Sequence, residues 1–173
     1  SLPIGGRMKT LSIDIETYSD VDLTKCGVYR YVDSLAFEIL LFAYKEGEKE
    51  TQVVDLAQGE QIPEEIRLAL LDDAIIKTAF NANFERVCLS KLLGEHLSAN
   101  SWCCTAVLAA SLGLPLSLEG VGRILNIEEQ KMKEGARLIR YFCLPCKGTK
   151  SNGMRERNFP HHACLLYTSD AAD

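Results

Sequence analysis

The sequence has no long hydrophobic run, few prolines and a single tryptophan. None of its 173 residues falls in a stretch approaching the ~20 apolar residues of a membrane span. Ser1–Arg7 also lacks the apolar core of a signal peptide. With 47% hydrophobic and 25% charged residues, the composition excludes collagen-like, disordered and coiled-coil classes. We therefore expect one soluble, cytoplasmic domain with no membrane partner.

An excess of basic charge is also lacking. The chain carries 19 basic and 24 acidic residues, for a net charge of -5, which argues against binding nucleic acid through a general basic surface. It leaves open an enzyme whose site uses carboxylates to hold metal ions. The seven cysteines are odd in number, so we predict reduced, buried thiols at Cys26, Cys88, Cys103 and Cys104 and no disulfide framework.

Strand and helix patterns alternate along the chain. Period-two or buried apolar segments predict strands, and apolar residues at helical spacing predict helices. The expected strands are 11–16, 37–44, 51–56 and 74–80. The expected helices begin at Pro63 and Asn81 and cover 105–112, 117–125 and 135–142, before a loop over 145–162. This order predicts an α/β fold in which a mixed sheet is covered by helices.

Asp14 and Glu16 are the first candidate site residues. Two positions apart on a strand, their side chains project to the same face of the sheet. We expect helices to bury that face, and unpaired buried carboxylates are costly. A pair of divalent metal ions, the usual device for phosphodiester cleavage, would satisfy both side chains. The alternative is an edge strand on which both carboxylates are solvated.

Glu85 is the next candidate, four residues after Asn81 in the first turn of a predicted helix. The helix dipole favours an anion there, so a purely helix-stabilising role is an equally good interpretation of Glu85. Asn81 or Asn83 is likewise explained by the preference for Asn at a helix N-cap.

Taken together, these two segments resemble the first two motifs of the DEDD-type 3′–5′ exonucleases. Asp14-Ile15-Glu16-Thr17 is similar to the first motif, and Asn81-Ala82-Asn83-Phe84-Glu85 to the second. The resemblance extends to the proofreading domains of phage-type family A DNA polymerases. The segments that carry it are 22–31, 37–44, 80–86, 113–118 and 158–163.

The resemblance implies a fold, a reaction and roles for particular residues. The fold would be ribonuclease H-like, with a three-stranded antiparallel meander followed by parallel strands. Two Mg²⁺ or Mn²⁺ ions would bind at the catalytic carboxylates, and the enzyme would release nucleoside monophosphates from the 3′ end of single-stranded DNA. The resemblance also implies a polymerase domain in the full-length protein. The protein would act in the cytoplasm of a bacterial or phage-infected cell. The implied metal ligands are Asp14, Glu16 and Glu85, with Thr17, Asn81 and Phe84 near the terminal nucleotide.

The third motif of the family, a Tyr or His followed by the fourth carboxylate, has no credible match. We therefore expect an upstream extension over 1–7, an exonuclease-like domain over 8–163 and a non-native tail over 164–173. The fourth carboxylate would follow Ala163 in the natural protein, and the chain as written would be weakly active or inactive. Two alternatives stay open: a non-catalytic nucleic-acid-binding module, and a free-standing DEDD nuclease that trims RNA or DNA.

A basic loop and a cysteine pair are the remaining features. Lys147, Lys150, Arg155 and Arg157 fall in one glycine-containing loop and are candidate phosphate contacts, although a solvated loop explains them as well. Cys143 and Cys146 are spaced for zinc, but no suitably spaced second ligand pair accompanies them, so we do not predict a zinc site.

Overall fold

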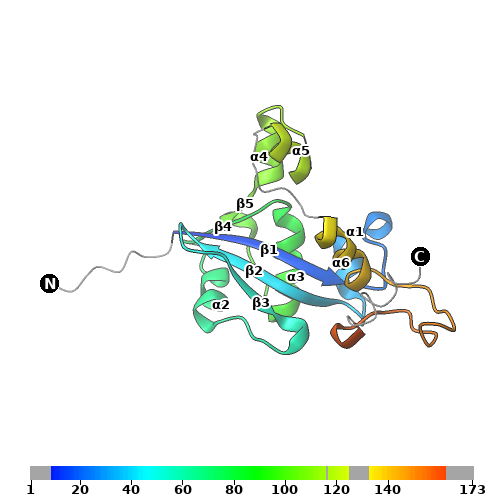
Figure 1. Ribbon diagram of the computed structural model, residues 1–173. Coiled ribbons are helices and arrows are strands. Elements are labelled where there is room, and N and C mark those ends of the chain that lie inside the picture. Colours follow the sequence, from blue (N-terminus) through cyan, green and yellow to red (C-terminus); the bar gives the residue numbers. More distant parts are fainter. Residues whose placement is uncertain (1–8, 116, 125–132, 163–173) are drawn as a thin grey trace.

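A five-stranded mixed sheet forms the centre of the computed structural model, which describes residues 9–115, 117–124 and 133–162 (Figure 1). The strand order is β3-β2-β1-β4-β5. β1 pairs antiparallel with β2 and parallel with β4, so the predicted meander followed by parallel strands is confirmed. The strands are β1 (Thr10–Tyr18), β2 (Glu38–Glu46), β3 (Gln52–Asp55), β4 (Ile76–Ala79) and β5 (Trp102–Cys104).

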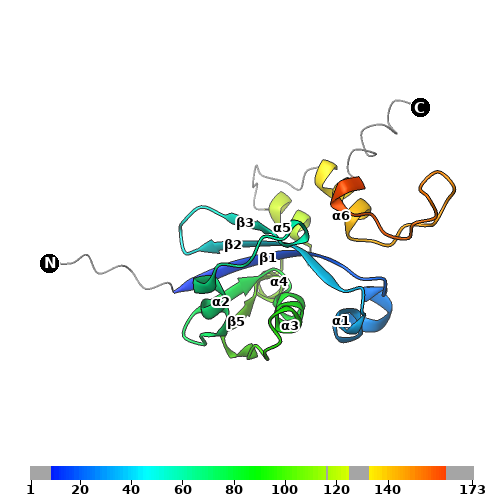
Figure 2. The same cartoon turned by 90° about the horizontal axis from the view of Figure 1, so that it is seen from below.

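Helices lie on both faces of this sheet. Figure 2 shows α1, α2 and α3 on one face, and α6 with the segment that follows it on the other. The helices are α1 (Leu23–Asp33), α2 (Glu64–Leu71), α3 (Ala82–Leu93), α4 (Thr105–Ser111), α5 (Leu118–Ile124) and α6 (Lys133–Phe142). Short 3-10 turns are η1 (Leu56–Gln58), η2 (Ala99–Ser101) and η3 (Pro160–His162). No helix in the described ranges is long and apolar enough to cross a membrane.

The hydrophobic core lies between the sheet and the α1–α3 layer. Alternate residues of β1 point into it, and Phe42 of β2 and Leu89 of α3 are completely buried. Strand alternation thereby sends one row of β1 side chains into the core and the other row to the opposite face. The β1 residues in the core are Leu11, Ile13 and Ile15.

Three details differ from the sequence predictions. α1 was not predicted, because Gly27, with φ 74°, kinks the helix and interrupts its periodicity. β5 is only three residues long, too short to produce a clear pattern. The prediction of buried thiols is confirmed for Cys88 and wrong for Cys103, which is exposed; Cys26 and Cys104 are half-buried. The predicted segments 1–7 and 164–173 lie outside the described residues.

Lys77 is a fully buried lysine on β4, and it ties the end of α2 to the sheet. Its Nζ donates a hydrogen bond of 2.8 Å to the carbonyl oxygen of Asp72, just after α2. Burial lowers the pKa of Lys77, and the charges of Asp73 and Asp72 oppose that shift.

We expect Lys77→Ala to reduce the free energy of unfolding by about 2–4 kcal/mol, because it removes buried methylenes and the partner of a carbonyl group. Lys49→Ala is the matched control, since Lys49 is exposed and makes only a surface ion pair with Glu46. That variant should change stability by less than about 0.5 kcal/mol. Urea denaturation of both variants measures the difference, and equal losses would contradict a structural role for Lys77.

Candidate active site

β1 carries Asp14 and Glu16 on the face of the sheet opposite the hydrophobic core. Ile13 and Ile15 are buried, whereas Asp14 is exposed and Glu16 is half-buried. The prediction that both carboxylates share one face is confirmed by this alternation. The pairing of β1 with β2 shifts register between Glu16 and Thr17, so the strand has an irregularity at the candidate site. Such irregularities commonly re-aim side chains beside functional sites.

The expectation that helices bury this face is wrong at Asp14. Its side chain is exposed in the described structure, and only the Glu16 end of the row is covered, by the end of α6. Burial therefore differs along the row, because α6 lies over the carboxyl end of β1 (Figure 2).

Glu85 is the buried member of the predicted carboxylate set. It lies in the first turn of α3 with 5% of its surface exposed, and its Oε2 atom has no hydrogen-bond partner. Burial raises the pKa of Glu85 to about 7; the negative charge of Asp14 adds to the rise, and the backbone N–H of Glu85 opposes it. The fold thus places Asp14 and Glu85, which are 71 positions apart in sequence, near enough for the charge of Asp14 to contribute to the raised pKa of Glu85.

These residues fit a divalent cation in charge and donor chemistry. Glu85 offers a buried carboxylate oxygen without a protein partner, and the negative charge of Asp14 acts on it. Carboxylate oxygens are the ligands that Mg²⁺ and Mn²⁺ prefer. Within the described ranges, no three Asp, Glu, His or Cys side chains are already gathered around one point as a complete metal site. Asp14 and Glu85 are therefore the two carboxylates that fit a divalent cation, and Glu16 lies further along the same face of β1 as Asp14.

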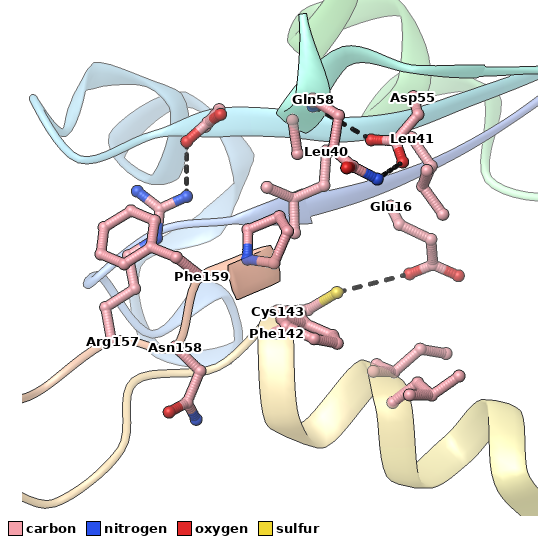
Figure 3. Close-up of a pocket in the computed structure, with 15 residues that line it drawn as sticks. Glu16, Leu40, Leu41, Asp55, Gln58, Phe142, Cys143, Arg157, Asn158 and Phe159 are labelled. Atoms are coloured by element: carbon pink, nitrogen blue, oxygen red, sulfur yellow. Dashed lines mark hydrogen bonds and ion pairs between the residues drawn. The ribbon is translucent and has the colours of Figure 1, made fainter. Parts of the chain in front are cut away.

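Glu16 borders a cavity of about 600 Å³ between α6 and the sheet (Figure 3). Cys143, just after α6, donates its S–H to Glu16 Oε2 across 3.8 Å. Burial, and then the charge of Glu16 and this hydrogen bond, raise the pKa of Cys143 to about 12, so the thiol stays protonated. The volume lies within the range of small-molecule sites. Much of the wall is apolar, from Leu40, Leu41, Ile139, Phe142 and Phe159.

The residues predicted near a terminal nucleotide take different positions. Thr17 is buried, and its hydroxyl shares a 2.8 Å hydrogen bond with the Tyr31 hydroxyl. Phe84 is half-buried and packs its ring 6.0 Å from that of Tyr31. Asn81 is the exposed N-cap of α3, without a side-chain capping bond. Whether a nucleotide contacts any of the three stays a prediction.

The basic loop divides into outward and inward side chains. Lys147 and Lys150 are exposed. Arg155 instead turns into its own loop, donating from Nε to Asn158 across 2.8 Å. Arg157 pairs with Glu38 of β2, and its guanidinium lies over the ring of Tyr18 at 4.0 Å. The predicted phosphate contacts therefore stay predictions, with the two lysines exposed and the two arginines engaged by protein groups.

Sequence reasoning missed the cavity and the contact of Cys143 with Glu16. The two residues are 127 positions apart, and no local pattern connects them. Phe142 and Phe159 also line the cavity from separate segments. Phe142, which precedes Cys143, was an available signal in the sequence, but without the fold nothing indicated that it lines a cavity with Glu16.

The fold of this chain is shared by exonucleases of known structure. It matches NrnC of Brucella melitensis bound to pGG, with a TM-score of 0.54 and 16% identity over 76% of this chain and 61% of that one. NrnC with bound Mg²⁺ gives a TM-score of 0.51 at 18% identity, over 81% of this chain and 68% of that one. Escherichia coli RNase D, an exoribonuclease, matches with a TM-score of 0.50 and 14% identity, over 76% of this chain and 35% of that one. The ribonuclease H-like exonuclease fold predicted from the sequence is confirmed.

The chain is homologous to part of a phage DNA polymerase. It is 54% identical over 155 residues to the DNA polymerase of Bacillus phage SP02, a match that covers 90% of this chain. It spans 24% of the length of that relative. No protein-family model matches the chain. The predicted resemblance to a phage polymerase segment is confirmed by this relationship.

Proposed function

We propose that this chain is the 3′–5′ exonuclease module of a DNA polymerase, which removes nucleotides from single-stranded DNA ends in the cytoplasm of a bacterial or phage-infected cell. The observation that carries the proposal is the Asp14–Glu85 carboxylate pair. Glu85 is buried with an unpartnered oxygen, and the charge of Asp14 acts on it. A buried carboxylate of this kind is unfavourable for folding and is common at functional sites.

Asp14, Glu85 and Glu16 would hold two divalent ions, Mg²⁺ or Mn²⁺. When bound, such ions supply charge stabilisation for phosphodiester hydrolysis. Glu16 lies at the wall of the cavity, where its carboxylate would face a nucleotide bound there. The apolar wall suits a base and sugar, and Lys147 and Lys150 are the exposed charges available to the phosphates of the strand.

Nucleotide release from labelled single strands tests the proposal. DNA and RNA of the same sequence, labelled at the 3′ or the 5′ end, are incubated with Mg²⁺, Mn²⁺ or EDTA. We expect a labelled mononucleotide from 3′-labelled DNA, with either metal and not with EDTA, for a chain extended past Ala163 to include the third motif, and little or no release for the chain as written. Faster release from RNA would instead favour a trimming nuclease. Binding without release from any substrate by the extended chain would contradict an exonuclease.

A non-catalytic nucleic-acid-binding module is the second candidate. The observation that favours it is that no complete cluster of three metal-ligating side chains is formed among the described residues. The two functions differ in their dependence on metal. The binding module should bind single strands and release no nucleotides with either Mg²⁺ or EDTA, whereas the nuclease should release nucleotides with Mg²⁺ and not with EDTA.

A further inference from the structure

The segment that covers the cavity is held together by its own hydrogen bonds. We call residues 133–162, which comprise α6 and the loop that returns beside it, the α6 segment. Asn158 is buried and donates from Nδ2 to the carbonyl of Tyr141 across 2.9 Å. The Cys146 N–H donates to the carbonyl of Glu156 across 2.8 Å, closing the base of the loop. The loop and the end of α6 therefore form one unit.

Two side chains fasten this unit to the sheet around the cavity. Cys143 contacts Glu16 at one side. At the other, Arg157 forms an ion pair with Glu38 of β2 (Figure 3). The Arg157 guanidinium also lies 4.0 Å from the ring centre of Tyr18 in β1. The cavity lies between these two attachments, and Glu16, Glu38, Cys143 and Arg157 all line it.

Arg157 is enclosed by protein groups. Its guanidinium lies between Tyr18 and Phe159, 4.7 Å from the second ring, and only 18% of its side chain is exposed. Glu38 neutralises its charge, and its buried Nε has no partner. A planar guanidinium can pair with a carboxylate and stack on an aromatic ring at the same time, which a lysine ammonium does less well. This environment suits an attachment point better than a phosphate contact.

We infer that Arg157 is a positioning residue that clamps the α6 segment to β1 and β2, and so keeps the cavity beside Glu16 in the shape that receives the terminal nucleotide. The inference rests on the proposed function for the identity of the ligand. Arg157 acts through Glu38 and Tyr18, and it does not itself contact the reacting phosphodiester.

The affinity for a short 5′-fluorescein-labelled oligothymidylate, measured by anisotropy in EDTA, tests the clamp without hydrolysis. We expect Arg157→Met to raise Kd at least about tenfold, equivalent to ~1.4 kcal/mol. Arg157→Lys keeps the charge but loses the planar stack, so its Kd should lie between that of the unmodified chain and that of Arg157→Met. Arg140→Met, which removes an exposed arginine of α6, is the matched control and should leave Kd within about twofold.

Glu38→Gln separates the clamp from a direct phosphate contact. The clamp predicts weaker binding, because the attachment is lost, and an unchanged dependence of Kd on salt. A phosphate contact predicts tighter binding, because Arg157 is released, and a shallower salt dependence in Arg157→Met. The exchanged pair Glu38→Arg with Arg157→Glu restores opposite charges, so it should bind more tightly than Arg157→Glu alone.

Hydrogen exchange supplies a readout that is independent of activity. Arg157→Met and Glu38→Gln should speed exchange in the α6 segment and leave β1 and β4 unchanged. The inference would be overturned if both variants kept the hydrogen exchange and the affinity of the unmodified chain. Tighter oligonucleotide binding by Glu38→Gln would also overturn it, and so would a failure of the unmodified chain to bind the oligonucleotide. Should Arg157→Met fail to fold, Arg157→Lys and Glu38→Gln decide the outcome. Loss of nucleotide release alone, with these effects intact, would remove the proposed catalysis and leave the clamp.

Discussion

Asp14→Ala is expected to abolish metal-dependent nucleotide release while leaving the fold intact. Asp14 is exposed on β1, so its removal creates no cavity in the core. Its negative charge acts on Glu85, and the variant would remove one of the two carboxylates proposed to hold the metal. In the chain extended past Ala163, we expect a loss well beyond tenfold in rate at saturating metal, measured with 3′-labelled single-stranded DNA.

Asp33→Ala is the matched control for this experiment. Asp33 is an exposed carboxylate of α1 that pairs only at the surface with Lys91. Its removal should leave nucleotide release unchanged, and circular dichroism should be the same for both variants. A loss of less than about tenfold for Asp14→Ala, ~1.4 kcal/mol of barrier, is incompatible with a shared metal ligand.

Glu85→Gln should stabilise the metal-free protein at alkaline pH and abolish activity. Because burial raises the pKa of Glu85 from 4.5 to about 7, the folded state retains a proton that the unfolded state releases between those values. The contribution of Glu85 to stability is therefore greatest below pH 4.5, and it is lost as the pH rises through about 7. The difference between the two pKa values corresponds to at most about 3 kcal/mol.

Urea denaturation in EDTA at several pH values measures this effect. Near pH 4 the variant and the unmodified chain should have similar free energies of unfolding. At pH 8 the glutamine variant should be more stable by about 1–3 kcal/mol. Glu65→Gln, which changes an exposed residue in the first turn of α2, should show no such pH-dependent gain. A constant difference between Glu85→Gln and the unmodified chain at every pH would contradict the raised pKa.

The strands and the shared face of two carboxylates were predictable because their signals are local. Alternation in β1 placed Asp14 and Glu16 together and opposite Ile13 and Ile15. The helical period after Asn81 placed Glu85 in a first turn, which α3 confirms. The electrostatic effect of Asp14 on Glu85 could not be predicted without the strand order, in which β4, which precedes α3, is the parallel neighbour of β1.

The surroundings of Glu16 could not be predicted from local patterns. Arg157 belongs to a basic loop, and composition alone suggested a phosphate contact. In the fold it reaches Glu38, 119 positions away, and stacks on Tyr18. Cys143 likewise contacts Glu16 only because α6 crosses the carboxyl end of β1 (Figure 2). Long-range packing of this kind leaves no periodic trace in the sequence.

Binding of Mn²⁺ at pH 8, measured by titration calorimetry, tests most directly whether the carboxylate pair is a metal site. The unmodified chain should bind the ion, and Asp14→Asn and Glu85→Gln should each weaken binding at least about tenfold, or ~1.4 kcal/mol. Glu65→Gln should bind as the unmodified chain does. Equal affinities in all four proteins, or no binding by the unmodified chain, would contradict a metal-dependent site built on Asp14 and Glu85.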